Sequence, residues 1–151
     1  MSDRNRNKSG IDLAARSRAR RRALQAIYAW QLSATPMAGV IAQFEHEQEM
    51  EIADLDYFKD LLQGIERECA DIDRKLREFL DREIAELDPI ERAALRIASY
   101  ELLHRSDVPY RVVINESIEL AKRFGSEYGH TYVNSVLDNA AGKWREAEYR
   151  K

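Results

Sequence analysis

From about Leu13 onward, apolar residues recur three and four positions apart almost to the end of the chain. In the first such segment Ala19, Ala23, Ile27 and Trp30 form one stripe, which is typical of a helix that buries a single face. The 151 residues include only 6 Gly and 3 Pro, too few for the many turns of an all-β fold. The sequence therefore predicts an all-α bundle of about seven helices.

The clearest helix boundary lies in "LDPIERAALRIASYELL". Asp88 suits the N-cap, Pro89 suits the first helical position, and Glu91 follows Asp88 at the spacing of a capping box. Pro109 ends this helix region, because proline disfavours helix in the residue before it. Gly125 is the expected C-cap of the next helix, and the last helix is expected to open at Ser126 and Glu127.

Three segments define the expected domain organisation. Residues 1–12 are predicted to be a flexible basic N-terminal arm, 13–145 a single helical domain, and 146–151 a polar tail. Within the domain, "SATP" at 33–36 ends the first helix, and a shorter helix follows through Phe44. Residues 54–80 have the pattern of one or two helices, in which Gly64 is a tolerated weak point.

Charge is unevenly distributed along the chain. Residues 1–22 hold eight Lys or Arg against two acidic residues, whereas the remaining 129 residues hold 16 basic and 25 acidic ones. A basic arm on an acidic body indicates contact with a polyanion such as nucleic acid. The alternative interpretation is that the arginines only keep the N-terminus solvated.

Motifs for catalysis, nucleotides and metals are not found in the sequence. There is no phosphate-binding glycine loop, and the three histidines and Cys69 lack the spacing of zinc ligands. Acidic neighbours of Cys69 disfavour its thiolate. We therefore expect no enzymatic activity, no catalytic residue, no metal and no cofactor. No secretory signal or apolar run of about 20 residues occurs, so we expect a cytoplasmic protein without a membrane contact.

Two surfaces combine positive charge with aromatic rings, a pairing suited to single-stranded RNA. On the first helix, the arginines can bind phosphates through their fork and the tyrosine can stack on a base. The predicted contacts on this helix are Arg16, Arg18, Arg20, Arg21, Arg22, Gln25 and Tyr28. The second surface surrounds the Gly125 turn, with Tyr128 nearby, and its predicted contacts are Lys122, Arg123 and Tyr132.

Three segments carry a resemblance to a known family: "ARRRALQAIYAWQLS", "LDPIERAALRIASYELLHRSDVPYRVVINESIELAKRFG" and "YVNSVLDNAA". In order and spacing, from about Ala15 to Ala141, the chain resembles the transcription antitermination factor NusB family. A similar domain precedes RNA cytosine methyltransferases, but this chain ends with the domain, so the free factor fits better.

The resemblance implies an all-α fold of two helical subdomains without enzymatic activity. It implies a partnership with NusE, a small-subunit ribosomal protein, on the single-stranded boxA element of nascent RNA. The pair would join the antitermination complex on RNA polymerase during ribosomal RNA transcription. A homodimer remains an alternative, since members of the family differ in oligomeric state.

The resemblance also assigns roles to residues. The RNA-binding arginines and Tyr28 fall on the first helix, and Tyr132 stands where many relatives carry Phe. The NusE contact falls on Glu91, with Arg92 and Arg96 on neighbouring faces. Two positions depart from the family pattern. Gly129 is expected to destabilise the start of the last helix by about 1 kcal/mol relative to Ala. Ser135 replaces a glycine, so a neighbouring helix is expected to approach less closely at this position than in the family.

Two other functions are compatible with the residues. One is an interaction scaffold, whose acidic body binds a basic protein without RNA selectivity. The other is a duplex-DNA binder of helix-turn-helix type, which ranks last because no basic recognition helix follows a short turn.

Overall fold

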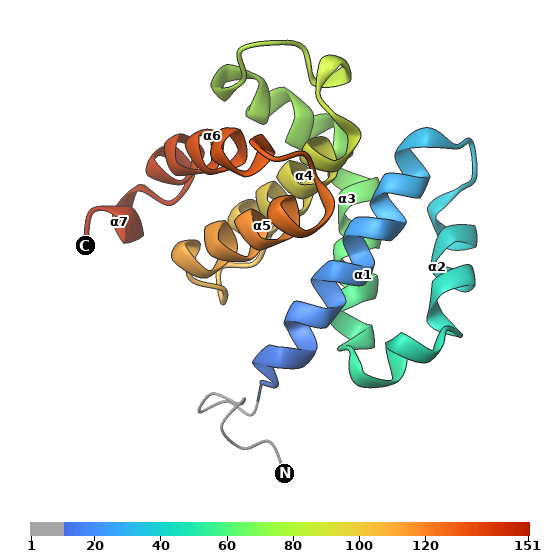
Figure 1. The fold of residues 1–151 in the computed structure, drawn as a ribbon. Helices are drawn as coiled ribbons and strands as arrows, with labels where there is room; N and C mark the ends of the chain where they lie inside the picture. The colour runs from blue at the N-terminus through green and yellow to red at the C-terminus, as the bar shows by residue number, and fades with distance from the viewer. Residues whose placement is uncertain (1–10) are drawn as a thin grey trace. The chain divides into compact units, whose positions relative to one another are not determined.

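The structure, a computed structural model, describes residues 11–151, apart from the side chains of Gln48 and Glu49 (Figure 1). The chain divides into two compact units, residues 1–63 and 64–151, with α3 passing from the first into the second. Within the described residues the elements are seven α-helices and three 3₁₀-helices, with no β-strand. They are α1 (Leu13–Leu32), α2 (Met37–Glu45), η2 (Gln48–Ile52), α3 (Leu55–Leu76), η3 (Arg77–Phe79), η4 (Ile84–Glu86), α4 (Pro89–His104), α5 (Tyr110–Phe124), α6 (Gly129–Trp144) and α7 (Glu146–Tyr149).

These elements confirm the all-α prediction. The predicted basic arm lies outside the described residues except for Ile11 and Asp12. Asp12 caps α1, because its carboxylate accepts a hydrogen bond of 3.0 Å from the backbone N–H of Ala15.

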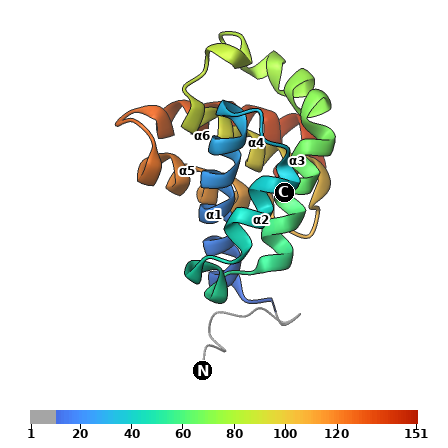
Figure 2. The ribbon, with the colours of Figure 1, turned by 90° about the vertical axis from the view of Figure 1, so that its right-hand side faces the viewer.

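In the first unit, α1, α2 and the start of α3 pack around a small apolar core (Figure 2). The predicted stripe of α1 is confirmed at Ala19, Ala23 and Ile27, which are fully buried, whereas Trp30 at its end is half-buried. The rings of Phe44 on α2 and Phe58 on α3 lie 6.1 Å apart. These contacts fix one face of α1 against the core and leave the other face for polar side chains.

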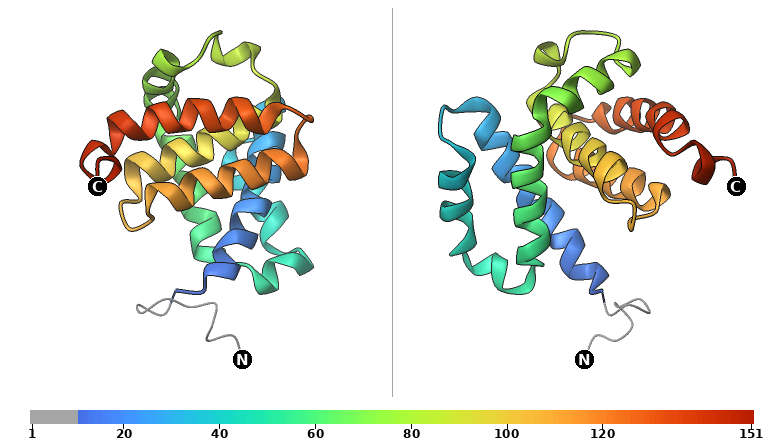
Figure 3. Two further views of the ribbon diagram at one scale, coloured as in Figure 1. Left: turned by 60° about the vertical axis from the view of Figure 1, so that its left-hand side comes forward. Right: turned by 180° about the vertical axis from the view of Figure 1, so that it is seen from behind.

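In the second unit, α4, α5 and α6 lie side by side (Figure 3). The predicted start of α4 is confirmed: Asp88 accepts hydrogen bonds from the N–H groups of Ile90 (3.0 Å) and Glu91 (3.2 Å), and Pro89 is the first helical residue. Gly125 is the C-cap of α5, as predicted, and its N–H donates to the carbonyl of Ala121.

The connection from η3 to η4 is fastened to α6. Phe79 packs edge-on against Trp144, with ring centroids 5.6 Å apart. Lys143 donates to both carboxylate oxygens of Glu78, at 2.7 and 2.9 Å. This connection therefore lies on the helix that carries Tyr132, one of the predicted RNA-binding residues.

Two segments differ from their sequence-based prediction. The last helix begins at Gly129 rather than at Ser126, because Ser126 to Tyr128 form a turn in which the Gly129 N–H donates to the Ser126 carbonyl. The predicted polar tail contains the helical turn α7, whose Tyr149 ring lies 5.1 Å from that of Tyr110. Its sequence is polar, yet tertiary contacts order it.

Candidate nucleic-acid interface

The exposed face of α1 carries the first candidate surface. Tyr28 keeps 37% of its surface exposed, and Arg18, Arg21, Arg22 and Gln25 are half-buried on the turns before it. Residues three and four apart on a helix are neighbours, so these side chains follow one another along the helix. These five side chains therefore share one face of α1.

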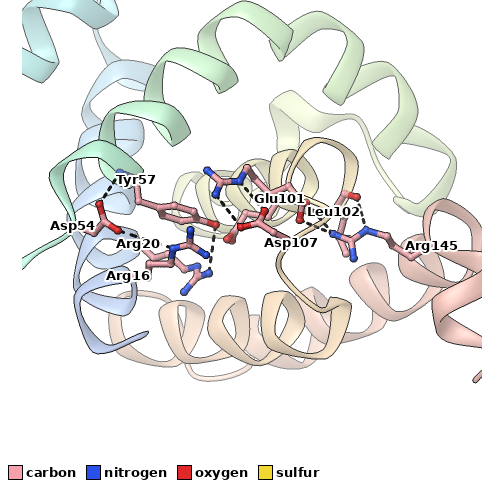
Figure 4. A network of polar contacts seen from close by, with 9 residues as sticks. Arg16, Arg20, Asp54, Tyr57, Glu101, Leu102, Asp107 and Arg145 are labelled. Carbon is pink, nitrogen blue, oxygen red and sulfur yellow. Dashed lines mark hydrogen bonds and ion pairs between the residues drawn. The ribbon is translucent and has the colours of Figure 1, made fainter. Parts of the chain in front are cut away.

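Two of the predicted arginines are held against α3 (Figure 4). Arg16 lies 4.0 Å from the Asp54 carboxylate and stacks over the Tyr57 ring, with its guanidinium carbon 4.3 Å from the ring centre. Arg20 is only 3% exposed, and its guanidinium donates to the Tyr57 hydroxyl at 3.5 Å. Arg20 consequently positions α1 and α3 rather than offering its charge at the surface.

The side chains of Arg18 and Arg22 are also held in place by contacts with neighbouring residues of the first unit. Arg18 Nε donates to the backbone carbonyl of Ile52 at 2.6 Å. Arg22 pairs with Glu47, donates to Gln25 and lies over the Phe44 ring at 5.0 Å. A guanidinium has five N–H donors in a fixed plane, so anchoring by one or two of them fixes the direction in which the rest point.

The second candidate surface surrounds the turn between α5 and α6. Lys122 and Arg123 are exposed in the last turn of α5, and Lys122 makes only a 4.0 Å ion pair with Glu119. Tyr128, just before α6, is 74% exposed, the largest value among the exposed large apolar and aromatic side chains described. Tyr128 is not among the RNA contacts predicted from the sequence.

Tyr132 lies one turn into α6 and is held by the η3–η4 connection. Its hydroxyl donates to Asp81 Oδ1 at 2.9 Å, and the Arg82 guanidinium lies 5.0 Å from the centre of its ring. Partial burial is the main reason why the pKa of the Tyr132 hydroxyl is raised. Sequence reasoning missed Asp81 and Arg82, which are about 50 positions from Tyr132 and belong to no recognisable motif.

The three residues expected to contact NusE are engaged within the second unit. Glu91 is only 8% exposed, and its pKa is raised, first by burial and then by the charge of Asp88. Arg96 forms a two-pronged pair with Asp73, at 3.1 and 2.8 Å. Arg92 donates to the backbone carbonyls of residues 84 and 85, at 3.5 and 3.3 Å.

Both departures from the family pattern have a structural explanation. A Cβ at residue 129 would lie 2.6 Å from Glu91 Oε2, so Gly129 leaves the space that this buried carboxylate occupies. Ser135 is exposed on α6, so its side chain is not placed between packed helices. The concern about a close helix approach at Ser135 therefore does not apply in this structure.

Residues 11–151 offer neither a cluster of metal ligands nor a membrane-spanning helix. In that range no three His, Cys, Asp or Glu side chains are placed to hold a metal ion, and no helix is long and apolar enough to cross a membrane. The pKa of the Cys69 thiol is raised, chiefly by burial and also by Asp73, which agrees with the expectation that its thiolate is disfavoured.

An all-α chain with an arginine-rich first helix and a basic turn before its last long helix has the features of a helical protein that binds nucleic acid. The model of the NusB family matches residues 17–142. The chain therefore belongs to the NusB family.

Close relatives and solved structures agree with this assignment. The chain is 62% identical to the transcription antitermination protein NusB of Xylella fastidiosa (strain 9a5c) over 143 residues, 95% of this chain and 91% of that protein. It is also 62% identical to that of Xanthomonas axonopodis pv. citri (strain 306), covering 93% and 89%. The structure of T. maritima NusB superposes with a TM-score of 0.78 at 26% identity, covering 89% of this chain and 96% of that one.

A second solved structure is a crystal structure of antitermination factors NusB and NusE in complex with dsRNA. It is similar to this chain with a TM-score of 0.74 and 25% identity, covering 91% of this chain and 97% of that chain. The two comparisons confirm the predicted NusB-like fold.

Proposed function

We propose that this chain pairs with NusE on single-stranded boxA RNA and acts in the antitermination complex on RNA polymerase during ribosomal RNA transcription. The observation that carries the proposal is the exposed ring of Tyr28 on the same face of α1 as Arg18, Arg21 and Arg22. Phosphate-binding forks followed by a stacking ring are the arrangement by which proteins hold single-stranded nucleic acid. The solved complex of NusB and NusE with dsRNA supports RNA and NusE as the partners.

Among the arginines of α1 only Arg20 is buried, whereas the other four keep part of their surface open to solvent. Arg16, Arg18, Arg21 and Arg22 would contact phosphates, whereas the buried Arg20 would hold α1 against α3. Lys122 and Arg123 would add two contacts on the second surface, with Tyr132 as a stacking ring. Six phosphate contacts to single-stranded RNA predict a slope of log K against log salt of roughly −4. Binding by this protein alone is therefore expected to be weak at physiological salt.

For NusE we propose the start of α4, with Glu91, Arg92 and Arg96. All three side chains make contacts inside the second unit, so a substitution there also changes the local structure. Binding to NusE should therefore be measured together with the free energy of unfolding. Arg92→Gln is the most informative variant, because it removes contacts to carbonyls but no buried ion pair.

The RNA surface is tested by fluorescence anisotropy of a labelled boxA RNA with saturating NusE. Tyr28→Ala should weaken binding by about 1–3 kcal/mol, roughly 5- to 150-fold, because one stacked base is lost. Arg18→Gln combined with Arg21→Gln should weaken binding and make the salt slope shallower by about 1.4. A duplex form of the same RNA is the competitor that distinguishes single-stranded from double-stranded recognition.

Matched controls come from the same chain. Leu32→Ala removes an exposed apolar side chain one turn beyond Tyr28, and Arg74→Gln with Arg150→Gln removes two exposed charges elsewhere. If the α1 variants bind RNA no more weakly than these controls, α1 is not the RNA surface and the proposal fails.

A further inference from the structure

Asp81 joins two side chains on the surface of the second unit. Its carboxylate accepts hydrogen bonds from Arg82 Nε at 2.8 Å, from Arg82 Nη2 at 3.1 Å and from the Tyr132 hydroxyl at 2.9 Å. The backbone N–H of Asp81 in turn donates to the Tyr132 hydroxyl at 3.4 Å. One carboxylate thus holds a guanidinium fork beside an aromatic ring.

This cluster is open to solvent. The side chains of Asp81 and Arg82 are 62% and 45% exposed, and exposed ion pairs contribute little to stability. The hydrogen bonds from Arg82 and then from Tyr132 lower the pKa of the Asp81 carboxyl, so it is ionised at neutral pH. An ionised but solvated carboxylate is readily exchanged for another anion of similar geometry.

The Arg82 fork has the geometry that such an exchange needs. Guanidinium binds carboxylate and phosphate alike, through two parallel N–H···O bonds, and Asp81 already engages it in this two-pronged way. Because the guanidinium lies over one face of the Tyr132 ring, 5.0 Å from its centre, a phosphate on the fork would be next to a base that packs at the edge or the other face of that ring.

We propose that Arg82 is a further RNA-binding residue and that Asp81 occupies its fork until an RNA phosphate replaces it. Asp81 then inhibits RNA binding by occupying the Arg82 guanidinium, and it also accepts the hydrogen bond of the Tyr132 hydroxyl. This inference rests on the proposed function, since it assumes that RNA reaches Tyr132. It adds a contact on the η3–η4 connection, where the sequence predicted none.

The test measures binding of the labelled boxA RNA in the presence of NusE by fluorescence anisotropy. Variants of the Asp81–Arg82 ion pair are compared with variants of a control ion pair elsewhere in the second unit. The control pair is Asp71 and Arg74, an i,i+3 ion pair on α3 of the same unit. Asp71→Asn changes the net charge as Asp81→Asn does, and Arg74→Gln changes it as Arg82→Gln does. Arg82→Gln should weaken RNA binding about 5-fold or more, because a charged fork is lost. Asp81→Asn should tighten binding about 3-fold relative to Asp71→Asn, because Arg82 no longer has a competing carboxylate.

The double variant Asp81→Asn with Arg82→Gln should show no tightening, since the gain requires the guanidinium. Thermal unfolding of each variant checks that the fold is kept, as expected for exposed side chains. If wild-type protein and NusE bind the RNA but each variant matches its control on α3, this inference is overturned while the proposed function stands. If the wild-type pair does not bind the RNA, both fail.

Discussion

Gly129 and Glu91 contact each other so closely that a Cβ at residue 129 would lie 2.6 Å from the Glu91 carboxylate oxygen Oε2. Gly129 begins α6 and Glu91 lies in the first turn of α4, so this contact joins the starts of two helices. The side chain of Ser126, in the turn before α6, partly offsets the raised pKa of Glu91. The buried carboxylate therefore lies at the turn of the second candidate surface.

Gly129→Ala is expected to lower the free energy of unfolding by about 1 kcal/mol, because the new methyl group overpacks Glu91. In a Glu91→Ala background the same substitution should raise stability, since Ala favours helix over Gly. Urea unfolding of the wild type, the two single variants and the double variant measures this coupling. Additive effects would show that the two side chains do not compete for the same space.

The raised pKa of Glu91 predicts a pH dependence of stability. Burial favours the protonated form in the folded state, so the folded protein binds this proton more tightly than the unfolded chain. The contribution of Glu91 is fully present below its unfolded pKa, about 4.3, and is lost as pH rises through the higher folded pKa.

Glu91→Gln, which stays neutral, should therefore gain stability relative to the wild type as pH is raised from 4 to 7. Urea unfolding of both proteins across this range measures the difference. A difference that stays constant with pH, or that falls, would contradict a raised pKa.

Gly64→Ala is expected to destabilise the second unit strongly. A Cβ at residue 64 would lie 2.2 Å from a carbon of the Tyr100 ring, and a buried ring cannot move aside. We expect a loss of at least about 2–3 kcal/mol, as for an overpacked core. Gly142→Ala in α6 is the control, because its Cβ would meet only ordinary contacts at 3.8 Å or more.

The outcome separates packing from helix propensity. Propensity alone predicts that both substitutions stabilise a helix by up to about 1 kcal/mol. Denaturant unfolding in which Gly64→Ala proved as harmless as Gly142→Ala would contradict the close approach of α3 and α4.

Arg145 links the end of α6 to the end of α4. Its guanidinium donates to the carbonyls of Glu101 (3.1 Å), Leu102 (2.7 Å) and Arg105 (3.0 Å), as Figure 4 shows for Leu102. Arg145→Met keeps the apolar stem but removes these charged hydrogen bonds, so we expect a loss of about 2–3 kcal/mol in the free energy of unfolding.

The exposed Arg150 provides the comparison for Arg145. It makes an i,i+4 ion pair with Glu146, so Arg150→Met should leave the urea midpoint nearly unchanged. Equal midpoints for the two variants would mean that the carbonyl contacts of Arg145 add nothing to stability.

The sequence predicted those parts of the fold that depend on local signals. Asp88 and Pro89 begin α4 because capping and a fixed proline φ act within a few residues. The apolar stripe of α1 likewise follows from helical periodicity. By contrast, α7 is held by contacts such as that between Glu148 and the backbone N–H of Tyr110, 38 positions away, and no local pattern reports them.

The candidate site shows the same division. Spacing along the helix places Arg18, Arg21, Arg22 and Tyr28 on one face of α1. It did not show that Arg20 is buried against Tyr57, 37 positions away, or that Asp81 holds Tyr132 from 51 positions away. The sequence likewise predicts only a weak point at Gly64, because its close neighbour Tyr100 belongs to another helix.

The central claim is that this protein binds boxA RNA selectively together with NusE. The most direct measurement is anisotropy of labelled boxA RNA and a scrambled RNA, with this protein alone, NusE alone and both, at two salt concentrations. We expect both proteins together to bind boxA more tightly than either alone and more tightly than they bind the scrambled RNA, with weaker binding at higher salt. Equal binding of the two RNAs, or no gain from NusE, would contradict it.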